Sequence, residues 1–136
     1  MTRKRFEDVE FGEELPELAP DTTVANVTRF TKAAGMFTGR FTDHEAARKE
    51  GLPGAIVPGI MSQALFVAMI HRWAPDATLL QIDTVFRAPV MVDQPHRATG
   101  VVTDMDETTR SLEIDLTLQN EAGETRVMGT AKVRLP

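Results

Sequence analysis

The amino-acid sequence predicts an α+β fold in which an antiparallel β-sheet wraps around one long buried helix. The segment 59–73, GIMSQALFVAMIHRW, is apolar around nearly its whole circumference, which is typical of a buried helix. The chain after residue 77 shows β-branched alternation interrupted by short acidic or glycine-containing turns, which is typical of neighbouring antiparallel strands. This order favours one sheet packed on one helix over a doubly wound parallel sheet.

Length and composition predict one globular domain, residues 1–136. Hydrophobic residues make up 42% of the chain, which is enough for a core of ordinary size. The chain has no cysteine and three scattered histidines, His44, His71 and His96. A disulfide framework is therefore excluded, and no metal site is expected.

Charge and hydropathy narrow the class of protein further. The net charge of −5 argues against nucleic acid as a partner, because nucleic-acid-binding proteins present a basic face. No apolar run approaches the roughly 20 residues that cross a bilayer. Acidic residues follow the basic start MTRKR where a signal peptide has an apolar stretch. We expect a cytoplasmic protein that does not bind membranes.

Before the central helix, the sequence predicts a leader and two helices. Residues 1–20 are acidic and turn-rich, and they predict an irregular leader. Thr23 has the chemistry of a helix N-cap, and apolar residues then recur at helical spacing until Gly35. The segment 43–50, DHEAARKE, predicts a short helix with acidic residues first, basic residues last and Gly51 as its terminator.

The central helix and the strands follow. Pro58 suits the first turn of the helix, because that position has no intrahelical N–H bond to lose, and Pro75 follows the helix end. Four strands are expected, at residues 78–90, 96–106, 110–120 and 125–135. One face of the third strand is apolar and consists of Leu112, Ile114, Leu116 and Leu118. Such a strand has one buried and one wet face, and a free sheet edge favours pairing between chains.

With these elements in order, the chain resembles the MaoC-like family of hot-dog-fold, (R)-specific enoyl-thioester hydratases and dehydratases. FEDVEFGEEL resembles the family's leader, and TVANVTRFTKAAG resembles its first helix. FTDHEAARKEGLPGAIVPGIMSQAL resembles the overhanging segment and the start of the central helix, and VFRAPVMVDQ resembles the strand-and-turn signature. The resemblance covers nearly the whole chain, and it implies a single hot-dog domain that forms dimers or larger assemblies.

The family's catalytic segment has the pattern D-x-N-P-x-H-x-D, and an H-G pair opens its central helix. Alignment without a gap places Met36 at the catalytic Asp and Phe41 at the catalytic His. Asp43 matches the second Asp, and Gly59 matches the Gly of the H-G pair, whose His is replaced by Pro58. The resemblance therefore retains the framework and lacks the acid–base pair.

The missing pair has a direct chemical consequence. Hydration of an enoyl thioester needs one group that takes a proton from water and one that delivers a proton to the α-carbon. Methionine and phenylalanine do neither, and a positioned acid–base group is worth about 10²–10⁴-fold in rate. In the family, Gly59 acts through its backbone N–H, which can still bind the thioester oxygen at the start of the helix.

Two pairs of residues have competing interpretations. Asp43 and His44 are the candidates to replace the missing acid–base pair, although Asp43 also stands where a helix N-cap belongs and His44 where a surface helix is expected. Met36 and Phe41 either form an apolar wall for an acyl chain or fill the core.

The remaining candidates are substrate-binding residues. Ser62, in the first turn of the central helix, either donates a hydrogen bond to a thioester or bonds back to its own helix. Arg40 is a candidate for a phosphate or carboxylate, and Arg87 and Arg97 are candidates for the phosphates of coenzyme A or a phosphopantetheine arm. That carrier is part of the substrate, so no separate cofactor is expected. We expect His96 to be exposed.

Three functions remain open. The one we favour is a subunit that binds acyl thioesters and lacks the dyad, working beside a catalytically complete MaoC-like partner, since family members occur as such paired halves. The second is a thioesterase or divergent hydratase that uses Asp43 or His44. The third is a non-catalytic acyl-thioester binding or assembly protein. The sequence leaves open the acyl chain, its carrier, the stereochemistry and the choice between a homo-oligomer and a hetero-oligomer.

Overall fold

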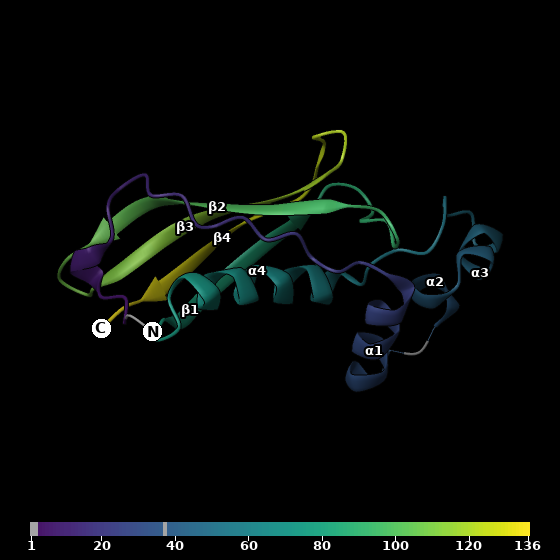
Figure 1. Ribbon diagram of the computed structural model, residues 1–136, viewed down its shortest axis with the longest axis horizontal. Coiled ribbons are helices and arrows are strands. Elements are labelled where there is room, and N and C mark those ends of the chain that lie inside the picture. The colour runs from purple at the N-terminus through teal and green to yellow at the C-terminus, as the bar shows by residue number, and fades with distance from the viewer. Residues whose placement is uncertain (1–2, 37) are drawn as a thin grey trace.

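The computed structural model describes residues 3–36 and 38–136 (Figure 1). Its elements are η1 (Phe6–Asp8), α1 (Val24–Ala34), α2 (Gly39–Thr42), α3 (His44–Lys49), α4 (Gly59–Trp73), β1 (Thr78–Phe86), β2 (His96–Asp106), β3 (Ser111–Asn120) and β4 (Thr125–Arg134). The strands form one antiparallel sheet in the order β1-β4-β3-β2. Figure 1 shows this sheet lying over α4, with α1, α2 and α3 gathered beyond the end where α4 begins. The predicted α+β architecture is confirmed.

The core lies between α4 and the inner face of the sheet. Phe66, Met69 and Ile70 of α4 are fully buried there. They face the apolar side of β3. The four side chains on that side are all buried, as the alternation predicted: Leu112, Ile114, Leu116 and Leu118. The sequence was therefore right about which face of this strand is covered.

One side of α4 is not covered. Ile60 is 57% exposed, and Ala64 and Ala68 are exposed as well. These residues are four apart, so they form a stripe along one face of the helix. The prediction of a helix buried all round is therefore wrong for a single chain, because one sheet covers only one side of a helix.

The predicted helix boundaries are confirmed by their caps. The Thr23 side chain accepts a hydrogen bond from the N–H of Asn26, and Gly35 ends α1 in the left-handed conformation, with φ 69°. Asp43 caps α3, and Gly51 follows its end, also with positive φ. The four-residue helix α2 was not predicted, because one turn is too short to show a hydrophobic period.

The leader is more regular than the sequence indicated. The N–H of Leu15 donates to the carbonyl of Gly100 at 2.9 Å, and Leu18 exchanges backbone hydrogen bonds with Ala98. Both leucines are buried. The leader thus covers the outer edge of β2, and β1 is left as the end strand on the other side. The two leucines are three residues apart, so the leader lacks the two-residue alternation of apolar side chains that predicts a strand.

His96 is buried, and the expectation that it is exposed was wrong. It is the first residue of β2 and is 5% exposed, on the same inward-facing series as Ala98, Gly100 and Val102. Its Nδ1–H donates to the carbonyl of Gln94 at 2.9 Å, and its Nε2 has no partner among the described residues. Burial lowers the pKa of His96 below the ordinary value of 6.5, and the charge of Arg126 acts in the same direction.

No helix in the part of the chain that the structure describes is long and apolar enough to cross a membrane.

The buried imidazole of His96 predicts a pH-dependent stability. Its pKa is lower in the folded chain than the 6.5 of a free imidazole, so the unfolded chain binds more protons below that pH. The free energy of unfolding should therefore fall as the pH drops below 6.5, by at most about 1.4 kcal/mol per pH unit for this one group. Urea unfolding at several pH values measures this slope.

His96→Gln should flatten the decline relative to the unmodified chain. The control is His71→Gln, which changes an exposed histidine on the last turn of α4. Equal slopes for His96→Gln and the unmodified chain would show that His96 does not cause the acid sensitivity.

Candidate functional site

A cavity of about 390 Å³ opens at the N-terminus of α4, beside the end of β1. Its lining residues are Ile56, Val57, Gly59, Ser62, Phe86, Arg87, Ala88, Pro89 and Val90. The lining is mostly apolar with a few convergent polar groups, and this is the usual composition of a small-molecule site.

Two extended segments build the wall of the cavity. The N–H of Val57 donates to the carbonyl of Val90 at 2.8 Å, and the N–H of Val92 donates to the carbonyl of Ala55 at 3.0 Å. Ile56 forms an isolated β-bridge between these two hydrogen bonds. The segment before α4 is thereby paired with the segment after β1, and it delivers the chain to the helix start in a fixed direction.

The first turn of α4 supplies unsatisfied hydrogen-bond donors. The N–H groups of Met61 and Ser62 donate to the carbonyl of Pro58, at 3.0 and 3.2 Å. Helix geometry leaves the preceding N–H groups, those of Gly59 and Ile60, without an intrahelical acceptor. The helix dipole places partial positive charge at the same end. An oxygen that carries negative charge is therefore stabilised beside Gly59.

Ser62 adds a buried hydroxyl to this site. Its side chain is completely buried and lines the cavity, and its Oγ has no hydrogen-bond partner among the described residues. Of the two interpretations offered by the sequence, the hydroxyl does not bond back to its own helix. A buried polar group without a partner costs free energy, and this hydroxyl is therefore available to an ordered water or a bound ligand in the cavity.

Phe86 is a site residue that the sequence did not single out. A Cβ added to Gly59 would lie 3.1 Å from Cζ of Phe86, so the ring lies directly against the backbone of the glycine. The ring is 53% exposed and forms part of the cavity lining. The signal that could have found it is its place at the start of the FRAP segment, immediately before a second candidate residue, Arg87.

The three candidate arginines lie in different places. Arg87 lines the cavity, and its N–H donates to the carbonyl of Arg126, whose own Nε donates to the carbonyl of Pro89. The backbones of two arginines thus meet at the rim of the cavity, and the Arg87 guanidinium lies 3.6 Å from Sδ of Met128. Arg97 instead donates to Oε1 of Gln119 at 3.0 Å and lines a separate, smaller cavity.

The third arginine, Arg40, forms an exposed ion pair of 2.8 Å with Glu50. Met36 and Phe41, which the sequence comparison placed at the family's dyad positions, are both half-buried. Phe41 packs against the core, and neither residue is among the described residues that line the cavity. These two side chains therefore contribute apolar contacts and no proton-transfer group.

Asp43 and His44 both have structural partners. Oδ1 of Asp43 accepts hydrogen bonds from the N–H groups of Glu45 and Ala46 and so caps α3. His44 is half-buried: its Nδ1 accepts from the N–H of Ala55 at 3.0 Å, and its Nε2 lies 2.7 Å from Oδ2 of Asp93. Hydrogen bonds use both nitrogens of the His44 ring, and neither Asp43 nor His44 is among the described residues that line the cavity.

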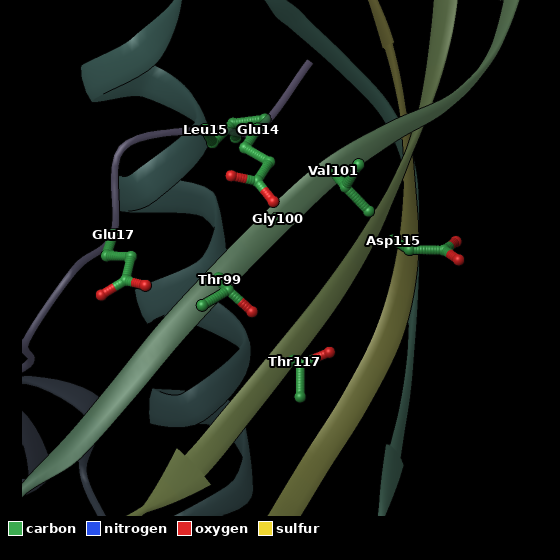
Figure 2. A pocket seen from close by; sticks show the side chains of 8 residues that line it. All are labelled: Glu14, Leu15, Glu17, Thr99, Gly100, Val101, Asp115 and Thr117. Atoms are coloured by element: carbon green, nitrogen blue, oxygen red, sulfur yellow. The ribbon is translucent and has the colours of Figure 1, made fainter. Parts of the chain in front are cut away.

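A second concave surface lies on the opposite face of the sheet (Figure 2). It has a volume of about 320 Å³ and is lined by Glu14, Leu15, Glu17, Thr99, Gly100, Val101, Asp115 and Thr117. Figure 2 shows the carboxylates of Glu14 and Glu17 extending from the leader beside β2. Three carboxylates without a lining cation repel anionic ligands. No cluster of three or more described histidines or carboxylates is suited to a metal ion. The apolar cavity at α4 is therefore the candidate site.

Comparison with known proteins places these features in a family context. The family model described as a MaoC-like domain matches residues 22–123. Comparison with curated proteins gives no match. Among solved structures, the (R)-hydratase from A. caviae involved in PHA biosynthesis superposes with a TM-score of 0.90 at 23% identity, covering 96% of this chain and 99% of that one.

Two further structures are similar. The R-hydratase PhaJ1 from Pseudomonas aeruginosa has a TM-score of 0.89 at 20% identity, with 97% of this chain and 85% of that chain covered. A chain of the ChsH1–ChsH2 complex from Mycobacterium tuberculosis has a TM-score of 0.86 at 19% identity, with 94% and 99% covered. At these identities the similarity shows the fold alone, and the predicted hot-dog fold is confirmed.

The unpartnered hydroxyl of Ser62 predicts that its removal does not destabilise the chain. An unsatisfied buried polar group costs about 1–3 kcal/mol, so Ser62→Ala should leave the free energy of unfolding unchanged or raise it by about 1 kcal/mol. The matched control is Ser111→Ala, because Ser111 is also buried but its Oγ lies 2.7 Å from Oγ1 of Thr109. That control should lose stability. Urea unfolding measures both variants, and equal losses would mean that Ser62 has a partner in the folded chain.

Proposed function

The chain belongs to the MaoC-like domain family, and from this premise we propose that it binds acyl thioesters in the α4 cavity as the dyad-lacking subunit of a hydratase or dehydratase. The observation that carries the proposal is the buried, unpartnered Oγ of Ser62, which lines the cavity together with Gly59. A site that keeps an unsatisfied donor at a helix N-terminus is preorganised for an oxygen that gains negative charge.

The cavity suits each part of such a substrate. The thioester oxygen accepts hydrogen bonds from the Gly59 N–H and the Ser62 hydroxyl, and the acyl chain packs against Val57 and Phe86. The phosphates of coenzyme A or of a phosphopantetheine arm lie toward Arg87, at the rim. Arginine binds phosphate well because its planar guanidinium offers several donors.

The same geometry supports binding more than catalysis by this chain alone. The dyad positions hold Met36 and Phe41, which transfer no protons. A thioesterase or divergent hydratase would need the Asp43 carboxylate or a free His44 nitrogen in the cavity, whereas neither residue lines it and both nitrogens of His44 are hydrogen-bonded. A purely non-catalytic binding or assembly protein would use the same cavity without a catalytic partner.

The surface around the cavity suits a second subunit. β1 is the end strand of the sheet. It exposes the large apolar side chains of Leu80, Val85 and Phe86, and α4 exposes Ile60. Exposed apolar groups beside a free strand edge favour association with another chain. We propose a cytoplasmic hetero-oligomer with a catalytically complete MaoC-like subunit, or a homodimer. The similar ChsH1–ChsH2 structure is a complex of two different proteins.

Binding is tested with crotonyl-CoA and longer enoyl-CoA thioesters by calorimetry on the purified chain. Loss of one neutral hydrogen bond is worth about 0.5–1.5 kcal/mol, so Ser62→Ala should weaken binding roughly two- to tenfold. The control, Ser111→Ala, changes a buried serine outside the cavity lining and should retain the affinity. Unchanged affinity of Ser62→Ala would show that its hydroxyl does not contact the thioester.

Catalysis is tested by following hydration of the same substrates together with release of free thiol. The chain alone should produce neither, because its dyad positions carry no acid or base. Adding a hot-dog protein that carries the D-x-N-P-x-H segment should produce hydration above the rate of that partner alone, with a mixed oligomer on size-exclusion chromatography. The proposal would be contradicted if this chain alone hydrated the substrate and the Asp43→Asn substitution abolished that activity.

A further inference from the structure

We propose that His44 and Asp93 are positioning residues that hold the wall of the α4 cavity in place. The proposal rests on the proposed function, because the wall they hold lines the proposed thioester site. They are 49 residues apart in the sequence and in direct contact in the structure. Neither residue is among those that line the cavity, so both act through the backbone between them and the site.

Both nitrogens of the His44 ring are used. The N–H of Ala55 can only donate, so Nδ1 of His44 accepts this 3.0 Å hydrogen bond and carries no proton. The proton of the neutral ring therefore resides on Nε2, which donates to Oδ2 of Asp93 at 2.7 Å. The ring has one fixed tautomer and one fixed orientation, and it joins the start of α3 to two other segments.

Asp93 connects the ring to the rest of the chain. Its second oxygen, Oδ1, accepts a hydrogen bond of 3.0 Å from the N–H of Val24, the first residue of α1. Its own N–H donates to the carbonyl of Thr22 at 2.8 Å. The hydrogen bond from His44, followed by that from the Val24 N–H, lowers the pKa of the Asp93 carboxyl. Asp93 also adopts a left-handed conformation with φ 66°, which few residue types other than glycine tolerate as readily as Asp and Asn.

Ala55 is where this network reaches the cavity. Ala55 is completely buried, so its N–H needs an acceptor inside the protein, and His44 supplies it. The carbonyl of Ala55 accepts from Val92, in the same pair of segments that holds Val57 against Val90. The imidazole thus supplies the last hydrogen bond of the paired segments that form the cavity wall. The first of these segments leads to Gly59.

The ring is also packed tightly in this place. A Cβ added to Gly54 would lie 3.0 Å from Nδ1 of His44, so a larger residue at position 54 would displace the ring. Loss of the His44 hydrogen bond would leave the Ala55 N–H unpaired and loosen this end of the wall, which the hydrogen bonds of Ile56 to Arg40 and of Val57 to Val90 still hold. The Gly59 N–H, which follows after Pro58, would then be held less firmly toward a bound thioester oxygen.

Two substitutions separate the two hydrogen bonds of the ring. His44→Asn places a side-chain oxygen near the position of Nδ1, so it retains the acceptor for Ala55 and loses the contact with Asp93. His44→Gln places an amide nitrogen near the position of Nε2, so it retains the contact with Asp93 and leaves the Ala55 N–H without an acceptor. Lys49→Gln, on the exposed side of the same helix, is the control.

The readouts are amide hydrogen exchange at Ala55 and Val57 and affinity for crotonyl-CoA. His44→Gln should raise exchange at both amides and weaken binding, each by about tenfold, as expected for loss of one hydrogen bond that orders the wall. His44→Asn keeps the acceptor for Ala55 and loses only the contact with Asp93 that orients it, so its losses should be smaller than those of His44→Gln. Lys49→Gln should stay within about twofold of the unmodified chain in both.

Three outcomes would overturn the positioning role. Unchanged exchange in His44→Gln would show that the ring does not hold the wall. Faster exchange with unchanged affinity would show that the wall does not matter to the site. Equal losses in His44→Asn and His44→Gln, together with lower thermal stability, would mean that the residue only supports folding. If the unmodified chain fails to bind any thioester, the proposed function fails, whereas the exchange data still decide whether His44 holds the wall.

Discussion

The packing of α4 against the inner face of one sheet is the constraint on which the rest of the molecule depends. Phe66, Met69 and Ile70 are buried in this contact, and Gly100 of β2 leaves the room for Met69, since a Cβ there would lie 3.2 Å from its Cε. The contact sets the position of the helix along the sheet. It therefore also sets where the free N–H groups of the first turn lie relative to the end of β1, and the cavity forms at that meeting point.

The helix start pairs a structural cost with a functional gain. Helix geometry leaves donors unsatisfied at Gly59, and Ser62 adds a buried hydroxyl without a partner. In a purely structural helix an alanine at position 62 would be the better residue, because burying an unpaired polar group is unfavourable. Binding sites commonly retain such groups, since their partners arrive with the ligand.

The sequence predicted the parts of the fold that local periodicity controls and missed the parts that long-range contacts control. The strand containing Leu112 was predicted because its side chains alternate, and α1 because Thr23 and Gly35 have the chemistry of caps. The leader was missed because it joins the sheet through backbone groups, which carry no sequence pattern. The contacts of His44 with Asp93 and of Phe86 with Gly59 join segments far apart in the chain, so no local sequence motif predicts them. Gly59 was a candidate from its place in the family pattern, Ser62 from its place in the first turn of the central helix and Arg87 from its charge, and all three line the cavity.

Binding and proton transfer are assigned to different elements in this fold, and this separation allows one to be lost without the other. The dyad positions Met36 and Phe41 lie after α1 and within α2, whereas Gly59 and Ser62 lie on α4. Apolar residues at the dyad positions do not disturb the helix start, and Phe41 adds contacts with the core. The wall between the two regions is held by His44, whose ring bonds to the backbone of Ala55 rather than to a reacting group. In the proposed function, such a chain would keep the donors for a thioester oxygen while a partner supplies the acid and base, because the two sets of groups share no side chain.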